Sequence, residues 1–98
     1  MTRPVLFQPE VRTDISEAAH RYEQERPGLG ERFAADLDEA LARVAEGPMQ
    51  FRILEDGIRR CPFRRFPYAV YFALEEPYIV VVAVLHRRRD PEVWRRRT

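Results

Sequence analysis

The residues best suited to chemistry gather near the C-terminal end of the sequence, where His86 ends an apolar run and begins a cationic one. A histidine beside cations is a candidate acid/base group, because neighbouring positive charge favours the neutral imidazole near pH 7. The spacing places no carboxylate or nucleophile near it. We therefore interpret His86 first as a structural histidine at a strand end, and second as a catalytic group.

Arginine is the other residue type that could bind or stabilise charge, and it accounts for all 17 basic residues. It binds phosphate or carboxylate through a fork of N–H donors, but its high pKa makes it a poor general base. The clusters are Arg59-Arg60, Arg64-Arg65, Arg87-Arg88-Arg89 and Arg95-Arg96-Arg97. Aromatic residues lie among these clusters, a mixture typical of nucleic-acid surfaces. The alternative, aromatic residues in the core and arginines on a solvated rim, stays open.

The charge is divided unequally along the chain. Residues 1–57 hold seven arginines against twelve acidic residues, a net charge of −5, whereas residues 58–98 hold ten against four, a net charge of +6. The basic half could therefore face a polyanion or an acidic protein.

Length and composition limit the other classes of function. A chain of 98 residues is one domain with a single modest core. Its one cysteine, Cys61, excludes an internal disulfide and suits a reducing cytoplasm. No phosphate loop, paired carboxylates or metal-ligand spacing is visible, so we expect neither a metal nor another cofactor. The apolar run at residues 79–85 is too short to cross a membrane.

Two helices are expected in the first half of the chain, after a short strand at residues 5–7. The first helix should begin at Thr13-Asp14, with Asp14 as N-cap and Glu17 completing a capping box. It should end at Pro27-Gly28. The second should run from about residue 30 to residue 46, before Gly47-Pro48. Such a short connection predicts an antiparallel helix hairpin.

The second half reads as three strands. A strand at residues 58–63 contains Pro62, which predicts either a bulge or a sheet edge there. Residues 68–74 and 78–86 should form a hairpin around the turn at 75–77, with the last strand central and apolar on both faces. Regular alternation along the last strand would place Val80, Val82 and Val84 on one face with His86, and Ile79, Val81, Ala83 and Leu85 on the other with Arg87. Asp90 could cap a short terminal turn that carries Trp94. The order β-α-α-β-β-β predicts an α+β fold, a helix hairpin packed on a small, mainly antiparallel sheet.

The chain as a whole resembles the RelE/ParE superfamily of toxins from type II toxin–antitoxin systems. The resemblance rests on residues 28–33 (GLGERF), Pro48 after the second helix, residues 65–71 (RFPYAVY) and residues 84–94 (VLHRRRDPEVW). It implies a cytoplasmic toxin that a cognate antitoxin neutralises. ParE-like members poison DNA gyrase, whereas RelE-like members are metal-free endonucleases that cut mRNA on the ribosome.

The absence of lysine, and of tyrosine after Tyr78, places this sequence nearer to the ParE-like members. For that reading, the residues expected to bind the target are Arg59, Arg64, Arg88, Arg89 and Trp94. For a RelE-like ribonuclease, the expected catalytic residues are His86, Arg65 and Arg87, with Arg59 as a further candidate. A third hypothesis is an inactive module that only binds an antitoxin.

Overall fold

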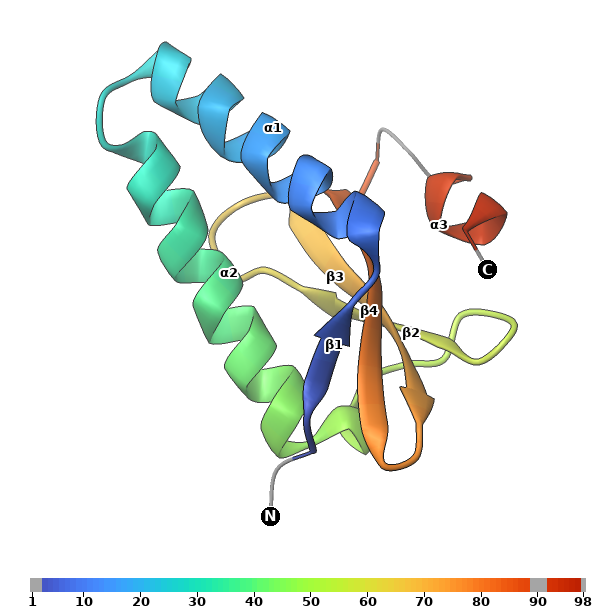
Figure 1. Ribbon diagram of the computed structural model, residues 1–98. Coiled ribbons are helices and arrows are strands. Elements are labelled where there is room, and N and C mark those ends of the chain that lie inside the picture. Colours follow the sequence, from blue (N-terminus) through green and yellow to red (C-terminus); the bar gives the residue numbers. More distant parts are fainter. Residues whose placement is uncertain (1–2, 89–91, 98) are drawn as a thin grey trace.

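Four strands form one sheet, and two long helices cover one of its faces, in the computed structural model, which describes residues 3–88 and 92–97 (Figure 1). The elements are β1 (Val5–Phe7), α1 (Pro9–Glu25), α2 (Leu29–Glu46), η1 (Pro48–Gln50), β2 (Ile58–Pro62), β3 (Tyr68–Glu75), β4 (Tyr78–His86) and α3 (Val93–Arg96). The predicted β-α-α-β-β-β order and α+β class are confirmed. The short helices η1 and α3 follow α2 and β4.

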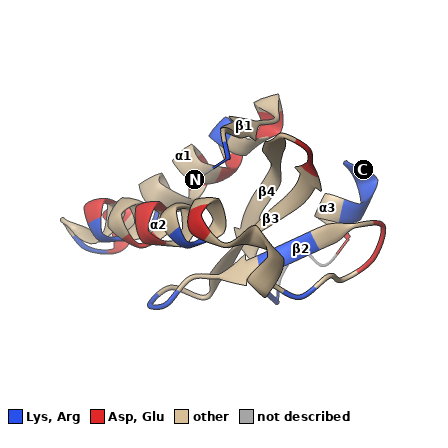
Figure 2. Cartoon of the chain, turned by 90° about the horizontal axis from the view of Figure 1, so that it is seen from below, with Lys and Arg blue, Asp and Glu red and all other residues tan. Residues whose placement is uncertain are grey.

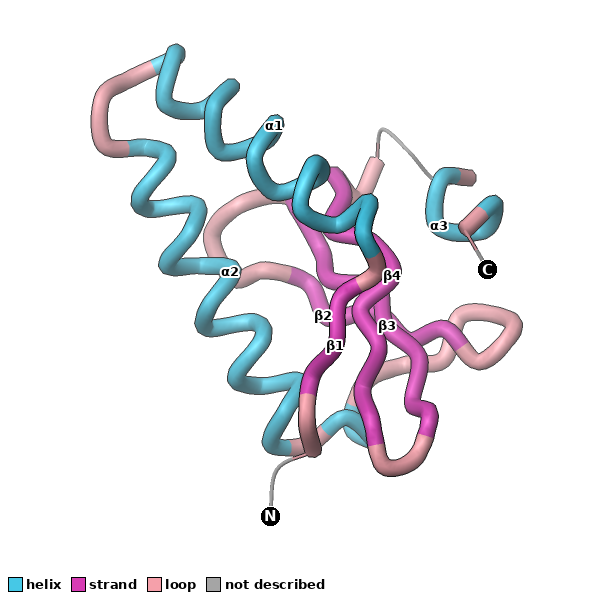
Figure 3. Tube along the Cα trace, viewed as in Figure 1, coloured by secondary structure: helices cyan, strands magenta, loops and turns pink. Residues whose placement is uncertain are grey.

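The strand order in the sheet is β1-β4-β3-β2, so that β4 lies between β1 and β3 as predicted (Figure 3). β1 runs parallel to β4, while β3 pairs antiparallel with both β4 and β2. β2 is the outermost strand on its side, which suits Pro62 because proline has no N–H to donate to a ladder. The chain just before β2 folds back along it through a bridge between Ile53 and Arg59.

The first helix begins earlier than the sequence predicted. α1 starts at Pro9, after the N-cap residue Gln8, so the expected start at Thr13-Asp14 is wrong. Proline suits the first turn, where an N–H would have no intrahelical partner and where its fixed φ is already helical. Asp14 therefore lies inside the helix, and its carboxylate is free to serve a different element.

The turn between α1 and α2 is built around two glycines. Gly28 adopts a left-handed φ of 94° before α2 begins. The carboxylate of Glu23 accepts hydrogen bonds from the N–H groups of Gly28 and Gly30, at 3.0–3.1 Å. A Cβ at position 30 would lie 3.1 Å from the carbonyl oxygen of Ala19, so glycine lets the helices approach closely there. The predicted antiparallel hairpin is confirmed.

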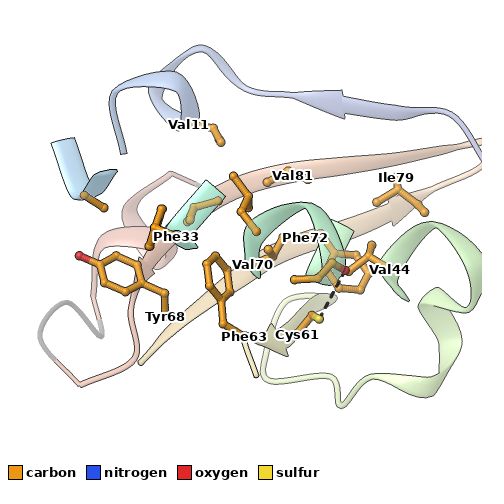
Figure 4. Packing of buried hydrophobic residues seen from close by; sticks show 14 residues of the cluster. Val11, Phe33, Val44, Cys61, Phe63, Tyr68, Val70, Phe72, Ile79 and Val81 are labelled. Atoms are coloured by element: carbon orange, nitrogen blue, oxygen red, sulfur yellow. Dashed lines mark hydrogen bonds between the residues drawn. The ribbon is translucent and has the colours of Figure 1, made fainter. Parts of the chain in front are cut away.

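The main core lies between this hairpin and the sheet, on what we call the helix-covered face (Figure 4). Phe33 on α2 is fully buried at its centre. Its ring lies 5.0–5.7 Å, between centroids, from the rings of Tyr22, Phe63, Phe66 and Tyr68. Offset and edge-on aromatic contacts of this kind add to the free energy of apolar burial.

A β-bulge interrupts β4. The pairing with β3 shifts by one residue between Tyr71 and Phe72, so that Val82 has no opposite residue. Before the bulge Val81 packs on the helix-covered face, and after it Val84 does. The expected grouping of Val80 and Val82 with Val84 and His86 is therefore wrong, because the bulge moves the residues after Val82 to the other face. The opposite face, which we call the open face, receives Val80, Val82, Ala83 and Leu85.

Within residues 3–88 and 92–97, none of the helices combines the length and apolar character needed to span a bilayer.

Candidate target-binding site on the open face of the sheet

The open face carries a second, smaller apolar cluster, which α3 covers in part. The helix hairpin and α3 lie on opposite sides of the sheet (Figure 2). Trp94 of α3 is 4% exposed, and its ring stacks on that of Tyr71, with centroids 5.7 Å apart and planes 15° apart. Trp94, predicted to bind the target, is thus mainly the anchor that fixes α3 to the sheet.

Beside this aromatic pair is a hollow of about 250 Å³, which we call the arginine pocket. Its lining residues are Arg52, Leu54, Glu55, Arg60, Tyr71, Arg87, Trp94 and Arg95. Four guanidinium groups thus share the pocket with one carboxylate. Such a concentration of positive charge attracts an anionic group.

Arg95 is the arginine of this pocket that already holds carboxylates. It donates to Glu55 from across the pocket and to Glu92 within its own turn, and its guanidinium lies over the ring of Trp94. The hydrogen bond to Glu55 is the main reason that the pKa of Arg95 is raised further. In the part of the chain that the structure describes, Arg52, Arg60 and Arg87 form no ion pair.

A largely buried ion pair between Asp14 of α1 and Arg97, directly after α3, fixes α3 next to the bulge at Val82. Arg97 donates to both carboxylate oxygens of Asp14, at 2.7 and 2.9 Å, and to the carbonyl oxygen of Val82, at 3.0 Å. Asp14 also accepts a hydrogen bond from the N–H of Val84 at 3.0 Å. We call this arrangement the Asp14–Arg97 clasp. The side chains of Asp14 and Arg97 are only 7% and 17% exposed, and the hydrogen bond raises the pKa of Arg97.

The clasp explains the bulge. A bulge leaves local backbone groups outside the ladder, and buried polar groups need partners. Here the carbonyl of Val82 and the N–H of Val84 find them in Arg97 and Asp14. One ion pair therefore joins α1, β4 and α3.

The structure places the three predicted catalytic residues at different locations. Arg87 lines the arginine pocket. Arg65 lines a separate hollow beside α2, where its backbone N–H donates to the buried carboxylate of Asp36. His86 is half-buried: its ring packs against Tyr68, on the helix-covered side, and its Nδ1 accepts a hydrogen bond from the N–H of Arg88 at 3.1 Å.

The predicted target-binding arginines are also dispersed. Arg59 donates to the carbonyl oxygens of Phe51 and Met49, which holds the chain before β2 in place. Arg64 pairs with Glu39 on α2, and Arg88 is exposed in the turn after β4. Arg89 lies outside the described residues, as do Asp90 and Pro91, so the expected cap at Asp90 is not described.

Sequence reasoning missed several residues of this site. Arg52 and Tyr71 reach the pocket only through strand pairing: Tyr71 is opposite Arg60, whose N–H bonds to the carbonyl of Arg52. The signal for this register is the short connection between the two strands at residues 58–62 and 68–75, which favours an antiparallel pair. No local signal pointed to the partnership of Asp14 and Arg97, which are 83 residues apart.

Cys61 is not a candidate nucleophile. It is fully buried against α2, and its thiol lies 3.7 Å from the carbonyl oxygen of Ala40. Burial raises the pKa of Cys61 to about 11, so the thiolate is scarce at neutral pH.

Comparison with known proteins agrees with this architecture. Residues 5–91 match the family model of the ParE toxin of the type II toxin–antitoxin system parDE. No curated protein matches the sequence closely enough to count as a relative. Among solved structures, the chromosomal ParDE toxin–antitoxin system from P. aeruginosa is similar, with a TM-score of 0.78 and 16% identity over 87% of this chain and 96% of that one.

A second solved structure shares the fold less closely. It is the toxin–antitoxin complex RelBE2 from Mycobacterium tuberculosis, with a TM-score of 0.61 and 19% identity over 89% of this chain and all of that one. At these identities the structural likeness shows the fold alone, while the family match spans most of the sequence. The chain therefore belongs to the ParE toxin family of type II toxin–antitoxin systems, within the RelE/ParE superfamily.

Proposed function

We propose that this toxin acts in the cytoplasm by binding DNA gyrase and poisoning it through protein–protein contact, and that a cognate antitoxin neutralises it. The family match over residues 5–91 carries the proposal. The pocket chemistry supports contact rather than catalysis, because arginine is a poor general base. Glu55, the carboxylate among the lining residues, is already bound to Arg95.

A gyrase assay tests the target directly. Purified toxin is added to gyrase with relaxed and with supercoiled plasmid, and supercoiling and enzyme-linked DNA cleavage are measured. We expect lost supercoiling or accumulated cleaved plasmid, with about tenfold more toxin needed for Arg60→Gln or Arg87→Gln. Arg26→Gln, at the distant turn between α1 and α2, is the matched control and should behave as wild type. No effect of saturating wild-type toxin would exclude gyrase.

The free edge of β1 is our candidate docking site for the antitoxin. In the parallel pairing of β1 with β4, the backbone groups of Leu6 are directed towards β4. The N–H and C=O groups of Val5 and Phe7 are therefore directed away from the sheet. An added strand could pair with them. Beside this edge is a largely apolar hollow of about 710 Å³, lined by Phe7, Gln8, Pro9, Val11, Arg12, Ile15 and Ser16.

Co-expression with the protein encoded by the adjoining reading frame tests neutralisation. Wild-type toxin should be captured in a complex and growth restored. Phe7→Asp, which places a charge at the edge of the apolar hollow, should weaken capture without impairing gyrase poisoning. Unchanged capture of Phe7→Asp would move the antitoxin site elsewhere.

The alternative target is mRNA on the ribosome, and one observation favours it: Arg52, Arg60 and Arg87 meet in one pocket, where they could stabilise the charge of a phosphodiester in transition. Induction should then produce cleaved mRNA, and Arg87→Ala should abolish the cleavage if the pocket is the site. Loss of cleavage in Arg65→Ala or His86→Ala instead would place the site away from the pocket. Intact mRNA after growth arrest would exclude this function. If overexpression without an antitoxin leaves growth unaffected, the third hypothesis, an inactive antitoxin-binding module, is favoured.

A further inference from the structure

A row of apolar side chains crosses the open face next to the arginine pocket. The strand registers place Leu6, Val80 and Ala73 side by side on β1, β4 and β3. Leu6 is 47% exposed, and Val80 and Ala73 are half-buried. Tyr78, two residues before Val80 on the same strand, is 42% exposed. A single exposed apolar residue is ordinary, but a contiguous row of them marks an interaction surface.

The next row along the strands carries the positive charge. Tyr71 lies two residues from Ala73 on β3, is opposite Arg60 on β2, and Arg60 in turn bonds to Arg52. Residues two apart on a strand are about 7 Å apart on the same face. A segment lying across the sheet on Leu6, Val80 and Ala73 would therefore have one border beside the arginine pocket.

From this juxtaposition we infer that the open face is a binding site for an acidic amphipathic helix of a protein partner. Its apolar stripe covers the row of Leu6, Val80 and Ala73, and a carboxylate on its border enters the arginine pocket. The inference does not depend on gyrase being the target, because it concerns the chemistry of the segment bound.

Charge complementarity favours this occupant. Arg52, Arg60 and Arg87 form no ion pair among the described residues, so a carboxylate would meet three guanidinium groups at once. Arg95 already binds Glu55 and Glu92 in this way, so the local geometry accommodates carboxylates. Charge-assisted hydrogen bonds to guanidinium are among the strongest available to a side chain.

The size of the pocket disfavours a free small molecule. Its volume of about 250 Å³ lies below the range of roughly 300–1,000 Å³ that is usual for small-molecule sites, but it suits the end of one side chain. A nucleic-acid strand would leave the apolar row unused and would bring phosphates near Glu55. A second copy of this chain would bring two arginine pockets together, with repulsion between like charges.

Trp94 offers a direct way to test the inference, because it is the only tryptophan and lines the pocket. The probe is a synthetic helical peptide of about four turns, without aromatic residues, with leucines along one face and glutamates along one border. We expect saturable changes in Trp94 fluorescence, weakened by added salt. Arg60→Gln and Arg87→Gln should each weaken binding about tenfold, and Leu6→Ala roughly threefold.

Three controls make the test decisive. The same peptide with glutamine in place of glutamate should bind at least tenfold more weakly, and Arg26→Gln should bind as wild type does. Circular dichroism shows that each variant is folded, and if Arg60→Gln is not, Arg87→Gln carries the test. The inference is overturned if saturating peptide leaves Trp94 unchanged, if a single-stranded RNA binds more tightly than the peptide, or if the chain self-associates through this face.

Discussion

Two arginines on or beside α2, on the helix-covered side of the sheet, share an acidic partner, whereas three of the four arginines that line the pocket on the open face form no ion pair among the described residues. Arg43 and Arg64 both donate to the carboxylate of Glu39 on α2. Arg52 and Arg60 are neighbours through a backbone hydrogen bond, and both line the arginine pocket with no ion pair in the described chain. Arginine thus forms stabilising ion pairs on the helix-covered side, while on the open face it provides positive charge that a ligand could neutralise.

This difference indicates that the helix-covered face contributes more to the stability of the domain than the open face does. The helix-covered face holds the fully buried aromatic centre around Phe33, together with Asp36, which accepts two backbone N–H groups of the β2–β3 loop. The open face holds a smaller cluster, an exposed apolar row and mutually repelling charges. Functional sites often combine exposed apolar surface and unpaired charge in this way, at some cost in stability.

The largest effect is expected at the centre of the helix-covered face. Phe33→Ala should lower the free energy of unfolding by about 3–5 kcal/mol, because it removes a ring in contact with four others and leaves a cavity. Trp94→Ala should cost only about 2 kcal/mol, because the short α3 can move to fill the space. Urea unfolding measures both, and a larger loss in Trp94→Ala would reverse the comparison between the faces.

The clasp should respond unequally to the loss of its two partners. Asp14→Ala removes the acceptor of both Arg97 and the N–H of Val84, so we expect a loss of about 2–4 kcal/mol. Arg97→Gln leaves Asp14 bonded to Val84 and should cost about half as much. A double-mutant cycle that gives no coupling between the two positions would show that the clasp does not form in solution.

Alkaline pH should affect the helix-covered face through Cys61. Burial raises the thiol pKa from 9.0 to about 11, so between these pH values the unfolded chain loses this proton and the folded chain keeps it. Stability is therefore unaffected below about pH 9 and falls as pH rises towards 11, by about 2 kcal/mol. Unfolding of the wild type and of Cys61→Ala across this range gives the contribution, and parallel pH profiles would contradict it.

The smallest effect on stability should come from the arginine pocket. Arg87→Gln should change the free energy of unfolding by no more than about 0.5 kcal/mol, and in the stabilising direction, because it relieves repulsion between like charges. Added salt should stabilise the wild type more than this variant, because it screens the same repulsion. A clear loss of stability in Arg87→Gln would mean that the arginine pocket stabilises the fold, as the helix-covered face does.

Much of the fold could be predicted because its signals are local. The stripe from Phe33 to Val44 and the flanking glycines predicted α2 almost to the residue, and the turn before Tyr78 placed β4. The start of α1 was missed because Asp14 has the sequence context of an N-cap, although Pro9 already opens the helix. Aspartate serves both as an N-cap and as the acceptor of a tertiary ion pair, so its residue type alone did not reveal which role Asp14 has.

The site was harder to predict, because it depends on contacts between distant segments. A strand that is apolar on both faces gives no sign of a bulge, so the face on which His86 lies could not be read from alternation. The clusters Arg59-Arg60 and Arg64-Arg65 each read as one patch, although Arg60 lines the arginine pocket while Arg59 and Arg64 are bonded elsewhere. Neighbouring side chains along a strand point to opposite faces of the sheet, so a run of arginines in the sequence overestimates the positive charge on either face.

The clasp also orders events during synthesis. Asp14 leaves the ribosome early, whereas Arg97 follows the end of β4 by only 11 residues, so the clasp can close only when almost the whole chain has been made. Trp94 and Arg95, which complete the arginine pocket, therefore join last. A chain cut short before Arg97 would keep the free edge of β1 but would lack the clasp, and with it the fixed position of α3.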